Sequence, residues 1–176
     1  MPLSALAAKN VGPRVICQIT RFILNAVRTV PSIIWALLFV AAVGLGPLAG
    51  ILALVAYSIG YLSKFFYEAF ELVDPAPPQA LKEIGANGLQ RFRFAVWPQA
   101  VAAVLSSGLF MFEYNIRAAS ILGIVDAGGI GFYLKQYIDY RFFPAVTAGL
   151  LMILVLVLAF DWLSSKIRNK LLRVRA

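Results

Sequence analysis

The strongest constraint on this chain is a long interval without charge: no Lys, Arg, Asp or Glu occurs between Arg28 and Lys64. A helix that crosses a bilayer needs roughly 20 consecutive, mostly apolar residues, so this interval is long enough for two. The GLGP sequence at residues 44–47 lies near its middle, and its glycines and proline would interrupt a helix. We therefore expect a hairpin of two spans, the first over residues 31–45 and the second starting near Leu48.

Two further uncharged runs follow, at residues 94–112 and 142–160. Across the chain, 61% of the residues are hydrophobic and only 14% are charged, whereas a soluble domain is usually about 45–50% apolar. The alternative is a soluble helical protein with a large core, but such a protein needs more polar side chains to cover its surface. The sequence therefore predicts an all-α, polytopic membrane helix bundle of about four spans.

The distribution of charge predicts how these spans are oriented. The net charge is +8, which could indicate nucleic-acid binding, but the basic residues flank the apolar runs instead of forming one patch. They are Lys9, Arg14, Arg21 and Arg28 before the first run, Lys64, Lys82, Arg91 and Arg93 around the gap between the second and third, and Lys166, Arg168, Lys170, Arg173 and Arg175 after the fourth. Positive charge marks cytoplasmic loops and contacts anionic lipid head groups. We predict that both termini and the central gap are cytoplasmic, and that no nucleic acid binds.

The residue types argue against bond chemistry in this chain. There is no histidine, and the single cysteine, Cys17, excludes an intrachain disulfide. The amino terminus, MPLSALAA, lacks the basic region and the long apolar run of a cleaved signal peptide. We expect no catalytic residue, no metal site and no cofactor. Residues 15–30 have the spacing of a helix with a polar face near the membrane surface.

The polar interruption at residues 78–99, PQALKEIGANGLQRFRFAVWPQ, is the most informative stretch of the sequence. Residues 78–84 can form about two turns of helix, and Gly85 suits the left-handed conformation that ends a helix. Asn87 and Gly88 signal a turn, after which a second helix starts near Leu89 and continues into the third span. The exposed apolar residues are too few for a core of their own, which favours docking onto a partner protein. The alternative is an ordinary connecting loop with no required spacing.

This stretch resembles the cytoplasmic loop of permease subunits of ATP-binding-cassette importers. The family pattern is Glu-Ala-Ala, three residues, Gly, nine residues, then Ile-x-Leu-Pro. The spacing here is the same, with identical residue types at Ala80, Gly85 and Pro98. The departures are Gln79 for Glu, Leu81 for Ala, Ala95 for Ile and Trp97 for Leu.

The resemblance implies the MetI-like fold of type I importer permeases and a coupling helix that docks into a partner ATPase. The residues it assigns to ATPase coupling are Gln79, Ala80, Leu81, Glu83, Gly85, Ala86 and Pro98. Because Gln79 replaces a glutamate, it can form a hydrogen bond but not a salt bridge. The implied organisation is a single transmembrane permease domain over residues 1–176, with a cytoplasmic or interfacial lead-in at 1–30, the coupling loop at 78–93 and a basic cytoplasmic tail at 165–176.

Two further stretches, residues 33–47 and 112–134, resemble permeases for phosphonates and related phosphorus oxyanions. The implied function is solute import by alternating access in the bacterial inner membrane. The implied partners are an ABC ATPase subunit, which would hydrolyse the ATP, a periplasmic substrate-binding protein and a second copy of the permease. A permease for another small solute such as methionine is the alternative in the same class, and a truncated, non-transporting membrane scaffold is the alternative outside it. The family core has five spans, and residues 1–8 resemble the end of the first, so we expect the chain to lack that span.

The glycine-rich segment around residues 123–131 matches neither a dinucleotide-binding nor a Walker pattern, which argues against nucleotide binding. We interpret it as a re-entrant or gate segment, where irregular backbone lines protein or water. The candidates for the substrate pathway or gate are Glu113, Asn115, Arg117, Ser120, Gly128, Gly129 and Gly131.

Charged residues in this region leave two alternatives open. Glu113 and Arg117 are one helical turn apart and could neutralise each other, or Arg117 could offer a counter-charge to an anionic solute. Asp126 would repel an anion, which favours a structural or gating role for it.

Overall fold

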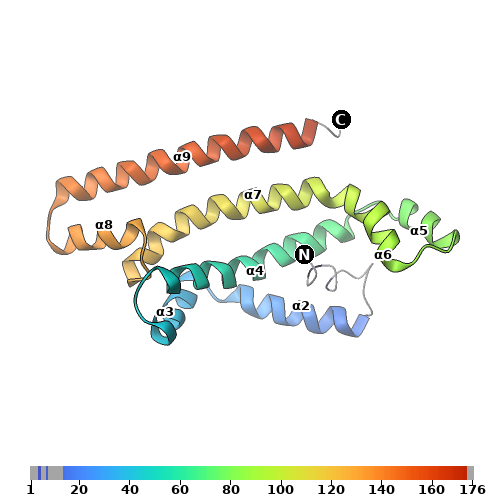
Figure 1. Cartoon of the computed structure of the whole chain (residues 1–176), viewed down its shortest axis with the longest axis horizontal. Helices are drawn as coiled ribbons and strands as arrows, with labels where there is room; N and C mark the ends of the chain where they lie inside the picture. Colours follow the sequence, from blue (N-terminus) through green and yellow to red (C-terminus); the bar gives the residue numbers. More distant parts are fainter. Residues whose placement is uncertain (1–3, 5–6, 8–13, 174–176) are drawn as a thin grey trace. The chain divides into compact units, whose positions relative to one another are not determined.

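The computed structural model describes residues 4, 7 and 14–173 and confirms the all-α prediction over that part of the chain. In chain order (Figure 1), the elements are α2 (Arg14–Thr29), α3 (Ser32–Val43), α4 (Pro47–Glu71), α5 (Ala76–Glu83), α6 (Gly88–Arg91), a π-helical turn (Phe92–Val96), α7 (Trp97–Leu122), a 3-10 turn (Gly123–Val125), α8 (Ile130–Asp139) and α9 (Phe143–Arg173). The expectation that residues 1–8 are the end of a further span falls almost entirely outside the described residues, as does the end of the basic tail.

Within the part of the chain that the structure describes, three helical stretches are long and apolar enough to cross a membrane, namely Pro47–Glu71, Gly88–Val125 and Phe143–Arg168. The span expected over residues 31–45 takes a different form. Helix α3 has 12 residues, which corresponds to about 18 Å at the usual rise per residue, less than the roughly 30 Å of a bilayer core. The count becomes four only if the bent pair α2 and α3 crosses as one broken span.

Pro31 explains why α3 begins as a separate helix. Its ring fixes φ at −58° and it cannot donate a backbone hydrogen bond. The backbone N–H groups of Ile34 and Trp35 bond to the Pro31 carbonyl at 3.0 and 3.2 Å and start the new helix. The Trp35 indole N–H donates to the Val27 carbonyl at 3.3 Å, which satisfies an acceptor that the break leaves without its helical partner.

The predicted helix break at residues 44–47 lies where the sequence places it, whereas the break predicted at residues 74–78 falls slightly earlier, at residues 72–75. Gly44 and Gly46 adopt φ of +89° and +132°, where glycine has no steric penalty, and Pro47 starts α4. At its other end α4 stops at Glu71. The Asp74 carboxylate then accepts from the Ala76 backbone N–H at 2.9 Å, and α5 begins with prolines in its first turn.

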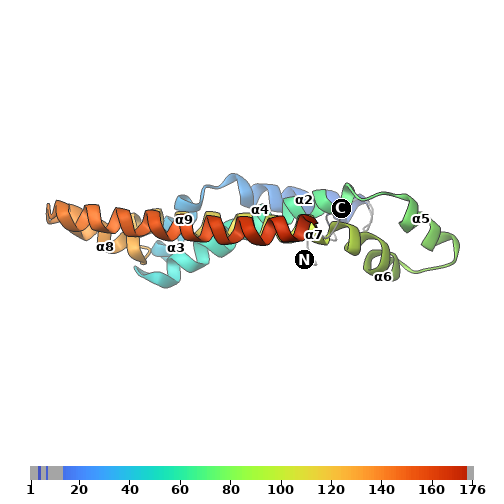
Figure 2. The ribbon, with the colours of Figure 1, turned by 90° about the horizontal axis from the view of Figure 1, so that it is seen from above.

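The chain forms two compact units. Unit 1 comprises Met1–Ala26 and Gly60–Gly108, and unit 2 comprises Val27–Ile59 and Leu109–Ala176. In unit 1, the end of α4 packs on the π-helical turn and the start of α7 through Phe66, Phe70, Val96 and Val104. Figure 1 and Figure 2 both show α5 and α6 next to each other within this unit. In unit 2, the core contains small and apolar side chains from α3, α4, the end of α7 and the segment before α8, among them Ala36, Ala53, Leu122 and Ala127.

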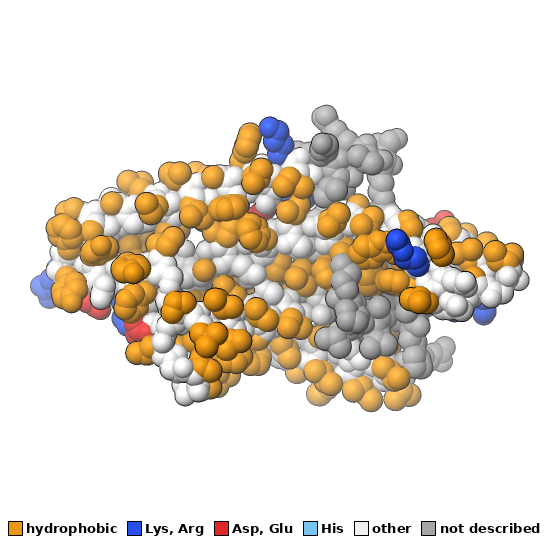
Figure 3. All heavy atoms as spheres, in the orientation of Figure 1, with side chains coloured by type: hydrophobic (Ala, Val, Ile, Leu, Met, Phe, Trp, Pro, Cys, Tyr) orange, Lys and Arg blue, Asp and Glu red, His pale blue; other side chains and the backbone are white. Residues whose placement is uncertain are grey.

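The surface of the described part is predominantly apolar. Figure 3 shows hydrophobic side chains over most of the described atoms of one face, with few Lys, Arg, Asp or Glu side chains among them. No residue of the most apolar window of α9 is buried within the chain, and Met152 and Val155 on this helix are 65% and 66% exposed. Lipid or other protein must cover such a surface, which agrees with a multi-pass membrane protein.

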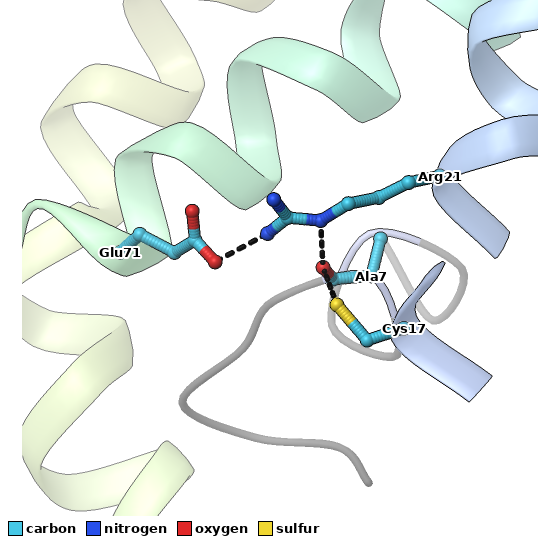
Figure 4. Close-up of polar contacts among 4 residues, drawn as sticks. All are labelled: Ala7, Cys17, Arg21 and Glu71. Atoms are coloured by element: carbon cyan, nitrogen blue, oxygen red, sulfur yellow. Dashed lines mark hydrogen bonds and ion pairs between the residues drawn. The ribbon is translucent and has the colours of Figure 1, made fainter. Parts of the chain in front are cut away.

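The apolar side chains of α2 are exposed, and part of its polar side packs against α4. Ile19, Phe22 and Ile23 are exposed, whereas the Arg21 side chain forms an ion pair with Glu71 and lies over the Tyr67 ring, 4.4 Å from its centre. Figure 4 shows Arg21 reaching from α2 to Glu71 at the end of α4. Both the Arg21 Nε and the Cys17 thiol donate to the Ala7 carbonyl at 2.8 Å. The predicted polar face is therefore partly an intramolecular contact.

Candidate functional site

The predicted coupling helix is α5, and a glycine ends it as expected. Gly85 has φ of +85°, a conformation that costs a residue with a Cβ roughly 1–2 kcal/mol. The Gly85 N–H bonds to the Lys82 carbonyl at 3.0 Å, and the Ala86 N–H bonds to the Leu81 carbonyl at 3.0 Å. These bonds satisfy carbonyl groups that the end of α5 leaves without helical partners.

The predicted turn at Asn87 is the cap of the next helix. The Asn87 side chain accepts from the Gln90 backbone N–H at 2.9 Å, and the Gln90 side chain accepts from the Asn87 backbone N–H at 2.8 Å. This reciprocal capping box fixes where α6 starts. Gly85 and Asn87 therefore fix the backbone between α5 and α6 by local hydrogen bonds and conformation, without packing against a large core.

Gln99 is a residue of this site to which sequence reasoning gave no role. Its side-chain oxygen accepts from the Asp74 backbone N–H at 3.0 Å, and its Nε2 donates to the Ala95 carbonyl at 2.9 Å. It thereby joins the segment before α5 to the start of α7. The Ala95 carbonyl lies in the π-helical turn that precedes α7, and Pro98, at the start of α7, has no backbone N–H to donate to this turn. In the sequence, a glutamine directly after this proline is the one local feature that could have indicated a role for Gln99.

The coupling loop (residues 78–93) borders two concave surfaces of different character. We call the first the apolar cup, a hollow of about 400 Å³ lined by Leu81, Ile84, Gly85, Ala86, Gln90 and Phe94. We call the second the basic pocket, about 280 Å³, whose lining includes Pro75, Pro78, Gln79, Lys82, Gly88 and Arg91. Of the predicted coupling residues, Leu81, Gly85 and Ala86 line the cup and Gln79 lines the pocket. Ala80, Glu83 and Pro98 are exposed and line neither.

The glycine-rich turn (residues 123–131) in unit 2 is a close-packed reversal of the chain. A methyl group at Gly131 would collide with the Ser120 carbonyl, and one at Gly123 would collide with the backbone of Gly131 and Phe132. Gly128 lies against Pro47 with φ of +77°. The Gly46 N–H donates to the Asp126 carbonyl at 3.0 Å. Glycine is thus required here by contact between backbones as well as by conformation.

Asp126 is held within this turn by a specific partner. It adopts the left-handed conformation with φ of +61°, and its carboxylate accepts from the Lys135 ammonium group at 2.7 Å. Both side chains are about one-third exposed, at 31% and 34%. The contact gives Asp126 a structural partner in the described structure.

We predict that Asp126→Asn and Asp126→Ala lower stability by different amounts. Asparagine tolerates the left-handed conformation, so it loses only the ion pair, about 0.5–1 kcal/mol for partly exposed groups. Alanine also incurs the backbone penalty of roughly 1 kcal/mol and should unfold at a lower temperature than the asparagine variant. Thermal unfolding of the two purified variants measures this order, and equal melting temperatures would contradict the backbone argument.

The remaining predicted pathway residues lie on α7, and the structure gives them different surroundings. The Asn115 side chain donates to the Ser58 hydroxyl at 2.9 Å, so its amide points toward α4. The neighbouring Tyr114 stacks on Tyr57, with 5.1 Å between ring centres, and its hydroxyl lies 3.4 Å from that of Ser32. Together these residues form a polar cluster among membrane-crossing helices.

Glu113 and Arg117 do not form the intrahelical ion pair that was one of the two alternatives. Among the side chains of residues 15–168, the ion pairs found are Arg21–Glu71, Lys64–Glu68 and Lys135–Asp126. Arg117 is exposed and Glu113 is half-buried. The described residues also contain no group of three or more His, Cys, Asp or Glu side chains that could hold a metal ion.

Comparison with known sequences identifies the family to which these features belong. The family model for the inner membrane component of binding-protein-dependent transport systems matches residues 1–173. Relatives include the phosphate-import permease protein PhnE of Mycolicibacterium smegmatis, 41% identical over 97% of this chain and 32% of the relative. The phosphite transport system permease protein PtxC of Stutzerimonas stutzeri is 42% identical over 93% of this chain and 60% of the relative.

Solved structures agree on the fold. A chain of the methionine ABC transporter MetNI, in an inward-facing conformation, superposes with a TM-score of 0.82 over 97% of this chain and 84% of that chain, at 18% identity. The present chain spans about a third of the length of the first relative and three fifths of the second. The match of the family model over nearly all of the sequence shows that this chain belongs to the inner membrane components of binding-protein-dependent transport systems.

Proposed function

We propose that this chain is the permease subunit of an ABC importer for a phosphorus oxyanion, either phosphonate or a closely related ion. One observation carries the substrate class: relatives about 40% identical over nearly the whole chain are named for phosphate and for phosphite. These ions share a small tetrahedral phosphorus centre with anionic oxygens. The solute would move by alternating access, and ATP hydrolysis would take place on a separate ATPase subunit.

In this proposal the coupling loop receives force from the ATPase. Its geometry supports the role, because Gly85, the Asn87–Gln90 capping box and Gln99 hold the loop in a defined shape. The apolar cup offers hydrophobic contact area, including Ile84 and Phe94, which are 79% and 71% exposed. The loop, both chain ends and the basic tail would lie on the cytoplasmic side of the inner membrane.

The solute pathway would run past α7 and the glycine-rich turn, between two copies of the permease. A periplasmic binding protein would deliver the solute and supply most of the selectivity. Arg117 is suited to attract an anion, because it is exposed and lacks an ion-pair partner within residues 15–168. Ser120, Gly128 and Gly129 would contribute to the gate.

Import of methionine is the second candidate in the same class, and the structural similarity to MetNI bears on it only through the fold. Because that similarity has only 18% sequence identity, it carries the fold and not the solute. A non-transporting scaffold is the candidate outside the class, and it predicts that no ATPase subunit binds.

Reconstitution tests the proposed function directly. The chain would be placed in liposomes with an ATPase subunit and a phosphorus-oxyanion-binding protein from the same genome. We expect ATP hydrolysis to rise when the binding protein carries methylphosphonate, phosphite or phosphate, with uptake of the same ion into the liposome. A methionine-binding protein serves as the matched control. Stimulation by methionine alone would contradict the substrate class, and failure of every ATPase subunit to bind would contradict the importer.

Gly85→Val tests the coupling role of the loop. A β-branched residue is disfavoured at the left-handed φ of this position by roughly 1–2 kcal/mol, so the end of α5 should rearrange. We expect ATPase binding and uptake to be lost while membrane insertion is kept. Gly85→Asn is the control, since asparagine accepts this conformation at helix ends and should retain most uptake. Equal uptake by the unsubstituted chain and both variants would contradict a mechanical role for α5.

Arg117→Gln tests the anion pathway. Loss of one charge-assisted hydrogen bond should reduce the uptake rate about tenfold, from the usual strength of such bonds. Arg117→Lys keeps the charge and should lose less, whereas Glu113→Gln should not reproduce the defect. Uptake at saturating binding protein measures all three. If Arg117→Gln transports at the unsubstituted rate, the solute does not rely on this side chain.

A further inference from the structure

Among the residues that the structure describes, two cations and no acid line the basic pocket. Its lining includes Lys82 from α5 and Arg91 from α6, and no Asp or Glu contributes to it. Neither cation takes part in the ion pairs within residues 15–168. Glu83, the acidic neighbour of Lys82, is exposed and does not line the pocket. The pocket is thus a concave site of uncompensated positive charge.

Arg91, which lines this pocket, has a buried side-chain donor without an acceptor in the described structure. Its Nε atom is buried and has no hydrogen-bond partner within the described structure. The guanidinium group lies beside Gly88, because a methyl group built on Gly88 would be in ordinary van der Waals contact with the Arg91 Nη2 atom, at 3.8 Å. A buried N–H group normally finds an acceptor, and the planar guanidinium presents a fork of donors that matches a carboxylate. The missing acceptor is therefore expected to be an anion.

Gln79 adds no negative charge to the basic pocket. It lines the same pocket as Lys82 and Arg91, at the position where the importer pattern has glutamate. A glutamate here could neutralise the cations from within the loop. The neutral glutamine leaves the positive charge for another molecule to compensate.

We propose that the basic pocket binds one Asp or Glu carboxylate of the ATPase subunit, with Arg91 as the bidentate contact and Lys82 as the second charge. This inference rests on the proposed function, because it assumes that the coupling loop docks an ATPase. It adds a charge polarity to that docking: the cations belong to the permease and the acid to the ATPase. The phosphate group of an anionic lipid is the competing anion, and the experiment separates the two.

The test measures binding of the purified ATPase subunit to the full chain in nanodiscs of zwitterionic lipid. Arg91→Gln and Lys82→Gln are compared with Arg93→Gln, which removes the same charge from an exposed residue outside the pocket. Truncating one partner of a desolvated charge pair weakens binding by about 30-fold or more. We expect this loss for Arg91→Gln, about tenfold for Lys82→Gln and no more than about twofold for Arg93→Gln. Melting temperatures confirm that each variant is folded.

A second set of variants, with reversed charges, identifies which Asp or Glu of the ATPase subunit binds in the pocket. Each exposed Asp and Glu on the ATPase face would be changed to lysine, and we expect one such variant to restore binding to Arg91→Glu. Equal ATPase binding by Arg91→Gln, Lys82→Gln and Arg93→Gln would overturn the pocket while leaving the coupling loop as the docking site. A defect that appears only in nanodiscs with anionic lipid would assign the pocket to lipid and also overturn the proposal. If the unsubstituted chain binds no ATPase, the proposed function itself fails.

Discussion

Gly131→Ala is expected to disrupt the glycine-rich turn and to abolish transport. The added methyl group would overlap the Ser120 carbonyl and crowd the Gly123 Cα. Both obstacles are backbone atoms, so no side-chain rotation can relieve the overlap. Overpacking of this kind costs about 3 kcal/mol, which corresponds to a fall in melting temperature on the order of 10 °C for a chain of this size. Thermal unfolding in detergent and uptake in liposomes measure the two effects.

Gly108→Ala is the matched control for this prediction. Gly108 lies within α7, and a methyl group built there meets no atom within 4 Å. Alanine should therefore stabilise the helix by about 0.5–1 kcal/mol through its higher helix propensity. A Gly131→Ala variant that melts as high as the Gly108→Ala variant would show that the chain reversal is looser than its backbone contacts indicate.

Arg21→Gln is expected to have the second largest effect on stability. The Arg21 and Glu71 side chains are only 19% and 24% exposed, so Arg21→Gln removes an ion pair that is poorly solvated. Loss of a buried partner costs about 3–5 kcal/mol, and the residual exposure here lowers our expectation to about 2 kcal/mol. The melting temperature should fall on the order of 5 °C.

A double-mutant cycle isolates the ion pair from the other contacts of Arg21, which include the Ala7 carbonyl and the Tyr67 ring. Glu71→Gln alone should also destabilise the chain, because it leaves the Arg21 guanidinium unpaired. The double variant Arg21→Gln with Glu71→Gln should lose clearly less than the sum of the two single losses. Additive losses would mean that the two side chains do not interact.

Local signals predicted the ends of the helices well. The glycines and proline at residues 44–47, the prolines at the start of α5 and the left-handed Gly85 all act within a few residues, and each helix boundary lies within a few residues of its predicted position. The long apolar runs likewise predicted α4, α7 and α9, because the length of a span is set by the bilayer and not by tertiary contacts. The motif spacing and the glycine-rich segment identified the same family as the sequence comparison.

Contacts between distant residues could not be predicted in the same way. Nothing near Gln99 indicates that it bonds to Asp74, 25 residues earlier. The partners Arg21 and Glu71 are 50 residues apart, and the spacing of α2 alone suggested a polar face toward the membrane surface. Residues 31–45 were expected to form one span because they are uncharged and apolar. Hydropathy alone does not show that Pro31 starts a separate helix too short to cross the bilayer. The sequence also could not show that Glu113 and Arg117 form no ion pair, because their spacing on a helix permits this contact without requiring it.

The central claim is that the coupling loop lies in the cytoplasm and docks an ATPase, and site-specific labelling tests it most directly. Cys17 is the single cysteine of the sequence, and Cys17→Ser keeps a donor for the Ala7 carbonyl. Glu83→Cys in that background places one thiol at an exposed position of α5. We predict that a membrane-impermeant maleimide labels this thiol in inverted vesicles but not in intact cells, and that added ATPase subunit protects it. Labelling in intact cells would place the loop outside the cytoplasm and contradict the account.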